Sequence, residues 1–215
     1  MAGIEMIFPE LIINSKNWQH LNHAWKSDRL PHALLFHGPQ GTGKEGHAME
    51  LTAMLNCTGG NTPPCGYCPS CKKTKSFQNG NVKLILPLPR GKISSSNDSS
   101  LKAFRNEKAL DEYLKMLKEK SQDPYYNIQV AGANTILINS IREIKQDVSM
   151  STVNNEWKVI LIFQAEKLCV PNPAAAHALL KVLEEPPERT VFILISSQPN
   201  VILETIHSRC QSLYF

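Results

Sequence analysis

The chain has 215 residues, a formal net charge of +4 and an apolar fraction of 42%. These values fit one large globular domain, alone or with insertions, and the small positive charge does not by itself indicate a dedicated nucleic-acid binder. No apolar run is long enough for a transmembrane helix, and the N-terminal MAGIEMIFPE lacks the basic and apolar regions of a secretory signal. We therefore expect a cytoplasmic protein with no membrane partner.

Apolar residues alternate along the chain between helical spacing and short continuous runs. The first run, 33–36, ends at Gly38 and Pro39, which is typical of a buried strand. At Asn172 and Pro173, an N-cap and a proline at the first helical position indicate a helix start. The expected strands are 33–36, 82–86, 134–138, 158–163, 190–196 and 211–215. The expected helices are 15–27, 43–55, 101–120, 140–149, 172–184 and 201–207.

Continuously apolar strands that alternate with helices are typical of a parallel sheet covered on both faces, so we predict an α/β three-layer fold. The segment 88–133 looks like an insertion into this pattern. Its part 91–100 is rich in serine and is expected to be mobile.

The sequence GPQGTGKE at 38–45 follows a predicted strand and opens a predicted helix, and it matches the phosphate-loop pattern GxxxxGK. Gly38, Gly41 and Gly43 let backbone N–H groups surround an anion, and Lys44 can reach terminal phosphates. The next position normally carries a hydroxyl that holds Mg²⁺, but here it is Glu45. Either the loop retains some ATP or ADP binding, or it is an inherited shape that no longer binds nucleotide well.

Two acids expected at the end of the 158–163 strand are also missing. In hydrolysing P-loop proteins an Asp organises Mg²⁺ there, and the Glu after it polarises the attacking water. Phe163 and Gln164 take these places, and Glu166 lies two residues further on, past the strand end. Together with Glu45, these changes predict a site that does not hydrolyse ATP.

Four cysteines lie within fifteen positions, at Cys57, Cys65, Cys68 and Cys71. In a reducing compartment this spacing indicates a four-thiolate zinc site, with tight turns between the last three cysteines. A closed set of four cysteines leaves no position for water, so the zinc is expected to be structural, in a module at 56–76. We expect the core of the sheet not to depend on it.

Lys72, Lys73 and Lys75 follow the cluster, and they either offset its negative charge in solvent or contact nucleic acid.

Three further stretches stand in a characteristic order around these motifs: RLPHALLFHG at 29–38, ALLKVLEEPP at 178–187 and SRC at 208–210. With the loop and the cysteine cluster, this order resembles the AAA+ subunits of bacterial clamp loaders, over about 30–86 and 134–215. The resemblance implies a RecA-like nucleotide-binding subdomain over 1–215 with a parallel five-stranded sheet. The 88–133 segment has no counterpart in that pattern, and the family's lid and collar domains are expected to be absent from this chain.

Within that family, the altered loop and missing acids look most like the delta prime type of subunit, not the ATP-hydrolysing gamma/tau type. The resemblance implies a rigid ring member that works with gamma/tau and delta subunits, the sliding clamp and primed DNA. It also implies that Arg209 acts in trans, as an arginine finger on a nucleotide held by the neighbouring subunit. The competing interpretation of Arg209 is a salt bridge with an acid such as Glu204.

Two other hypotheses stay open from the residues alone. One is an active gamma/tau-type ATPase in which Glu45 or Glu166 takes an unusual role. The other is an unrelated P-loop protein whose zinc module and adjoining lysines bind nucleic acid.

Overall fold

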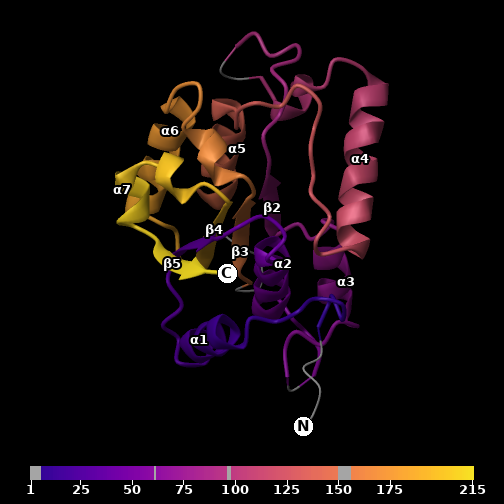
Figure 1. Ribbon diagram of the computed structural model, residues 1–215, viewed down its shortest axis with the longest axis vertical. Coiled ribbons are helices and arrows are strands. Elements are labelled where there is room, and N and C mark those ends of the chain that lie inside the picture. Colours follow the sequence, from indigo (N-terminus) through magenta and orange to yellow (C-terminus); the bar gives the residue numbers. More distant parts are fainter. Residues whose placement is uncertain (1–5, 61, 96–97, 150–155) are drawn as a thin grey trace.

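A five-stranded parallel sheet forms the centre of the protein in the computed structural model, which describes residues 6–60, 62–95, 98–149 and 156–215 (Figure 1). The strands lie in the order β2–β3–β4–β1–β5, and all neighbours are parallel. The strands are β1 Ala33–His37, β2 Val82–Ile85, β3 Lys158–Ile162, β4 Thr190–Ser196 and β5 Gln211–Tyr214. The α/β fold class is confirmed, and so is the five-stranded parallel sheet that the family resemblance implies.

Helices cover both faces of this sheet. Side chains of α1, α2 and α3 pack with one face, and side chains of α5, α6 and α7 pack with the other. The helices are α1 Ser15–Lys26, α2 Lys44–Leu55, α3 Pro69–Lys75, α4 Glu107–Gln122, α5 Ile138–Ser149, α6 Ala174–Glu184 and α7 Glu204–His207, with short 3-10 turns at Ser100–Ala103, Ala165–Leu168 and Pro199–Val201. Within the described stretches, we find no helix with the length and apolar character that a membrane span requires.

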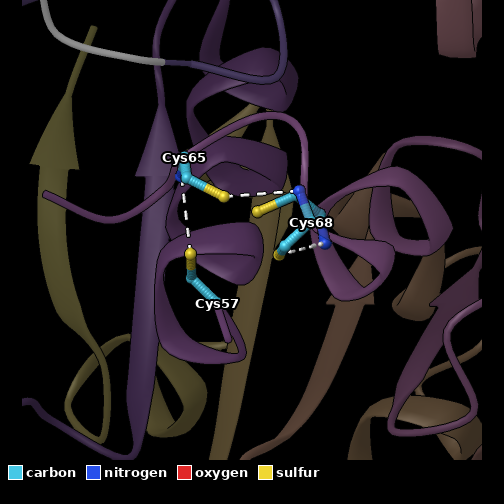
Figure 2. Close-up of side chains that lie close together, drawn as sticks. Cys57, Cys65 and Cys68 are labelled. Carbon is cyan, nitrogen blue, oxygen red and sulfur yellow. Dashed lines mark hydrogen bonds between the residues drawn. The ribbon is translucent and has the colours of Figure 1, made fainter. Parts of the chain in front are cut away.

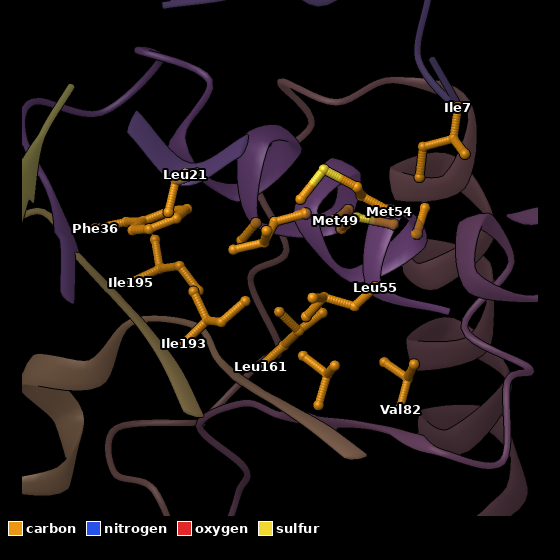
Figure 3. Close-up of a cluster of buried hydrophobic side chains, with 14 of the residues drawn as sticks. Ile7, Leu21, Phe36, Met49, Met54, Leu55, Val82, Leu161, Ile193 and Ile195 are labelled. Atoms are coloured by element: carbon orange, nitrogen blue, oxygen red, sulfur yellow. The ribbon is translucent and has the colours of Figure 1, made fainter. Parts of the chain in front are cut away.

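Each strand supplies both hydrophobic layers, because successive side chains of a strand point to opposite faces. In β4, Ile193 and Ile195 pack toward α1 and α2, whereas Phe192 and Leu194 pack toward α5 and α6. Figure 3 shows the first of these layers, where Met49 of α2 lies near the side chains of β4. Burial of one such side chain contributes about 1.5–3 kcal/mol, so the two layers account for much of the stability.

The strand order creates a crevice between β1 and β4. After β1 the chain crosses to β2 at one edge of the sheet, whereas after β4 it crosses to β5 at the opposite edge. Open α/β sheets bind ligands outside the carboxyl ends of two such strands, because the connections diverge there and leave space. This crevice is therefore the expected position of a binding site.

Residues 134–138 do not form the strand that the apolar pattern predicts. Thr135 makes a single antiparallel bridge with Leu88, the N–H of Ile136 donates to the carbonyl of Lys167, and α5 already begins at Ile138. Ile136 and Leu137 are buried, but Ile136 packs into the core layer under α5 and α6, and Leu137 packs into a small cluster with Phe104. The apolar run thus reflects burial, not sheet pairing.

Three helix assignments also differ from the sequence-based predictions. The helix expected at 101–120 is divided into a 3-10 turn and α4, which starts after the N-cap Asn106. Helix α6 starts at Ala174, so Pro173 is the cap residue and not the first helical residue. The short helix expected at 201–207 is a 3-10 turn followed by α7, because the chain is extended at Ile202.

The segment 88–133 lies between β2 and α5 and contains α4, which stands beyond the β2 edge of the sheet (Figure 1). Most residues of a small hydrophobic cluster come from this segment, and the ring centroids of Phe104 and Tyr113 lie 5.0 Å apart within it. The part expected to be mobile, 91–100, includes residues 96–97, which lie outside the described residues.

Backbone N–H groups of the N-terminal segment bind two buried polar side chains of α2. Glu50 accepts from Ile7 at 3.0 Å and from Phe8 at 2.7 Å, and His47 Nε2 accepts from Asn14 at 2.9 Å. With Nε2 acting as acceptor, His47 Nδ1 carries the proton and donates to the carbonyl of Gly43 at 2.8 Å. Burial lowers the pKa of His47, and the bond to Gly43 offsets part of this effect.

The neutral state of His47 gives a testable prediction. Because folding lowers its pKa below 6.5, the stability that His47 contributes should be present above pH 6.5 and decrease as the pH falls below it. NMR titration of the ring should show a neutral Nδ1–H tautomer at pH 6.5. An imidazolium at that pH in the folded protein would contradict this assignment. The stability that His47 contributes is measured as the difference between wild type and His47→Gln, and His23→Gln, at an exposed position, is the control.

Candidate functional site

The loop 38–43 connects the carboxyl end of β1 to the first turn of α2, at the crevice between β1 and β4. Gly38 and Gly43 have φ values of 148° and 78°, a region that side chains disfavour. A Cβ atom on Gly38 would lie 2.3 Å from the carbonyl oxygen of Phe215, which directly follows β5. The loop therefore has the tight glycine-dependent shape that the phosphate-loop pattern predicts.

Lys44 turns back toward the loop that precedes it. Its Nζ donates to the carbonyl of Pro39 at 2.8 Å, and the residue is 7% exposed. Burial lowers the pKa of Lys44, while Glu45 and Glu166 oppose that shift. An incoming phosphate would have to compete with the Pro39 carbonyl for this ammonium group.

Glu45, at the position where a hydroxyl was expected, is paired with a lysine from a distant part of the chain. Its carboxylate forms an ion pair with Lys120, near the C-terminal end of α4, whose side chain is 1% exposed. The sequence gives no sign of this contact, since a lysine on an amphipathic helix is normally solvated. Only the three-dimensional arrangement connects the segment 88–133 with the phosphate loop.

The two positions that carry acids in hydrolysing P-loop proteins hold uncharged side chains. Phe163 is fully buried in the core between the sheet and α2. Gln164 has a left-handed backbone, with φ of 53°, and its amide donates to the carbonyl of Ile128 at 2.9 Å. Neither side chain can hold Mg²⁺ as a carboxylate does or act as a base toward water.

Glu166 lies closer to the pocket than its position past β3 suggests. It is buried, and the hydroxyl of Ser196 at the end of β4 donates to it at 2.6 Å. Glu166 lines a cavity of about 140 Å³ together with Lys44 and Glu45. This volume is well below the ~300 Å³ at the lower end of ordinary small-molecule sites.

The four cysteine sulfurs of the predicted zinc module converge, as Figure 2 shows for the labelled three. All four Sγ atoms lie within 4.8 Å of one another, and none is in a disulfide. A tetrahedral zinc with Zn–S bonds near 2.3 Å requires sulfurs about 3.8 Å apart. The donor set therefore fits a four-coordinate zinc ion after a small contraction.

Backbone N–H groups point at these sulfurs. The N–H of Cys65 donates to Cys57 Sγ, that of Cys68 to Cys65 Sγ, and that of Cys71 to Cys68 Sγ, each at 3.4 Å (Figure 2). Burial raises the pKa values of Cys57 and Cys71, whereas donors from Cys71 and Thr58 outweigh burial at Cys68 and lower its pKa to about 6. Such donors stabilise thiolates, which are the form that binds a metal.

The cysteine module is part of the main core, contrary to the expectation that the core does not depend on it. Cys65, Cys68 and Cys71 belong to the same buried cluster as α2 and the N-terminal segment. A Cβ atom on Gly66 would lie 2.7 Å from the carbonyl oxygen of Met6, so the module and that segment are in close contact. The expected tight turn from Cys68 to Cys71 is the first turn of α3, with Cys68 as its N-cap.

Arg209 and the phosphate loop lie at opposite ends of the parallel strands. It precedes β5, which runs parallel to β1 with Leu34 opposite Gln211 and His37 opposite Tyr214. The loop follows the carboxyl end of β1, whereas Arg209 lies near the amino end of β5, about 15 Å away along the strands. Arg209 is thus positioned away from the phosphate loop of its own chain.

The guanidinium of Arg209 is held by surface contacts. It donates to Glu184 Oε1 at 2.8 Å and to the carbonyl of Thr205 at 3.0 Å, and its side chain is 35% exposed. The acid is Glu184, at the end of α6, and not the sequence neighbour Glu204. An exposed ion pair contributes about 0–1 kcal/mol, so a binding partner can displace it easily.

Comparisons with known proteins agree with the motifs. The family model described as "DNA polymerase III, delta subunit" matches residues 13–215. The DNA polymerase III subunit delta' of Bacillus subtilis is 29% identical over 195 residues, covering 91% of this chain and 45% of that protein. The gamma/tau subunit of Mycobacterium bovis is 26% identical over 203 residues, covering 94% of this chain and 27% of that protein.

Among solved structures, a DNA polymerase III gamma subunit-related protein from Thermotoga maritima matches with a TM-score of 0.44 and 19% identity, over 86% of this chain and 41% of its own. The chain spans less than half the length of the relatives named above. Because the family model matches residues 13–215, the family predicted from the phosphate loop, the cysteine cluster, the ALLKVLEEPP run and the SRC triplet is confirmed, and the chain belongs to the DNA polymerase III delta subunit family.

Proposed function

We propose that this chain is the nucleotide-binding-type part of a clamp-loader subunit of DNA polymerase III, of the delta prime type. The full-length protein would assemble with gamma/tau and delta subunits and help to load the sliding clamp onto primed DNA. In this proposal it does not hydrolyse ATP, and it supplies Arg209 to the ATP site of a neighbouring subunit. The placement of Arg209 is the observation that carries the proposal.

The arginine-finger role is supported by the position of Arg209 on the sheet. The residue is partly exposed and lies near the amino ends of the strands, whereas the phosphate loop lies at their carboxyl ends. Its guanidinium is therefore better placed to reach a neighbouring molecule than the phosphate loop of its own chain. A guanidinium spreads its donors over the charge that develops on a transferring phosphoryl group. The exposed pair with Glu184 holds the side chain at the surface without burying it.

The lack of hydrolysis is supported by the contents of the pocket. Glu45 forms an ion pair with Lys120, Phe163 is buried in the core, and the Gln164 amide is hydrogen-bonded to the carbonyl of Ile128. None of these residues supplies a magnesium ligand together with a base for water. Lys44 and the glycine loop could hold the phosphates of ADP or ATP, and the proposal does not require such binding.

The zinc ion is proposed to be structural. Four thiolates would complete a tetrahedral shell around it, so no open position remains for substrate or water. The ion would fix the loop 57–68 and α3 against α2 and the N-terminal segment, all of which share one buried cluster with three of the cysteines.

A second candidate function is an active gamma/tau-type ATPase, and one observation favours it. Glu166 is buried in the same pocket as Lys44 and is oriented by a 2.6 Å hydrogen bond from Ser196. In that reading Glu166 would polarise the attacking water in place of the missing glutamate.

In the full-length protein reconstituted with its gamma/tau and delta partners, Arg209→Ala should slow ATP hydrolysis at the one neighbouring ATP site that this arginine serves by on the order of 10³-fold. Arg209→Lys should not restore the rate, because an ammonium group lacks the planar fork of donors. Exposed Arg105→Ala is the matched control. An unchanged rate with Arg209→Ala, in a complex that assembles normally, would remove the finger role.

ATP turnover by the purified full-length protein alone separates the two candidate functions. We expect phosphate release that is no faster than that of Lys44→Ala, with or without Mg²⁺. Magnesium-dependent turnover that is abolished both by Lys44→Ala and by Glu166→Gln would instead establish the active ATPase.

Metal removal should affect the whole domain and not the cysteine loop alone. Metal-replete protein should contain one zinc per chain, and chelation or Cys68→Ser should lower the Tm by about 10 °C. Cys169→Ser, outside the cluster, is the control and should leave the zinc content unchanged. Finding no zinc in metal-replete protein would refute the metal site.

A further inference from the structure

The ammonium group of Lys120 is fully engaged by the protein. Its Nζ donates to the carbonyls of Pro124 at 2.8 Å and Tyr126 at 2.7 Å, and it forms the ion pair with Glu45. An ammonium group has three N–H donors, so each one has a partner. A buried lysine with three oxygen acceptors behaves as a bound cation and not as a solvated surface charge.

This cation lies beside the two positions that hold Mg²⁺ in hydrolysing P-loop proteins. Glu45 occupies the position of the magnesium-binding hydroxyl, and Phe163 occupies the position of the magnesium-organising aspartate. Lys120 is ion-paired with the first and lies 5.8 Å from the ring centroid of the second. Its three oxygen partners are also the ligand type that hard cations prefer.

The charges around the loop are balanced without any ligand. Lys44 and Lys120 supply two positive charges, and Glu45 and Glu166 supply two negative ones. Glu45, Glu166 and Lys120 all act on the pKa of Lys44, so the four groups share one electrostatic environment. The loop needs neither phosphate nor a metal ion for neutrality.

We propose that Lys120 is a permanent counter-ion of the phosphate loop, standing in the place of Mg²⁺ and keeping the loop and the first turn of α2 folded with no nucleotide or metal bound. The segment 107–126 supplies this cation and closes around it, which gives a role to part of the region between β2 and α5. The inference rests on the proposed function only in that the pocket does not turn over ATP, and its tests measure stability and amide exchange instead.

A double-mutant cycle tests the coupling between the two side chains. Lys120→Met keeps the volume but leaves Glu45 and two carbonyls without a partner, and we expect it to lower the Tm by about 10 °C. In a Glu45→Gln background the carboxylate charge is already absent, so Lys120→Met should lower the Tm by less than half as much. Exposed Lys118→Met, on the same helix, should have little effect in either background.

Equal losses in the two backgrounds would overturn the proposal, because Lys120 would then act independently of Glu45. If the Lys120→Met variant does not fold while the double variant does, the cycle supports the proposal in its strongest form.

Hydrogen exchange on the wild-type protein gives a second test that needs no variant. The amide of His47 donates to the carbonyl of Gly43 and so reports on the junction of loop and helix. Without nucleotide, this amide should exchange as slowly as those in the middle of α2, and added Mg–ADP should not slow it further. Fast exchange that becomes slow only with Mg–ADP would show that the loop depends on ligand, and would contradict the proposal.

Discussion

In a parallel sheet all strands point the same way, so their carboxyl ends and their amino ends form two different surfaces. This asymmetry determines where the candidate functional residues lie. The carboxyl ends of the strands bring together the glycine loop after β1, the residues after β3 and the serines at the end of β4. Arg209 lies just before β5, near the amino ends of the strands. One chain thus has a phosphate-type loop at the carboxyl ends of its strands and a surface guanidinium near their amino ends. A ring of similar subunits would require this arrangement if each subunit supplied an arginine to its neighbour.

Much of the fold follows from local sequence patterns. Continuous apolar runs predict the central strands, because a sheet covered on both faces buries their side chains on both sides, and Gly38 and Pro87 mark the ends of the first two runs. The pattern fails at 134–138, where Ile136 and Leu137 are buried without strand pairing. It also gives no helix at 69–75, because α3 is short and is defined by its cap at Cys68. Burial and pairing produce the same apolar signal, and only the packed structure separates them.

The candidate site was predictable where its residues lie close together in sequence. The four cysteines and the glycine loop are both contained in short segments, so their spacing alone indicates their geometry. Lys120 was not predictable, because its partner Glu45 comes from another helix and the pairing depends on how α4 packs. Glu166 was underestimated for a similar reason: the 3-10 turn after β3 brings it back under Ser196, which sequence distance does not reveal.

The most direct test is the structure of the assembled complex with ADP and a phosphoryl transition-state analogue such as aluminium fluoride. We expect Arg209 to leave Glu184 and contact the analogue in the neighbouring subunit, while Lys120 and Glu45 of this chain remain paired. This expectation would be contradicted if Arg209 stayed on Glu184, away from any nucleotide, or if the analogue and magnesium were bound at Lys44 of this chain with Lys120 displaced.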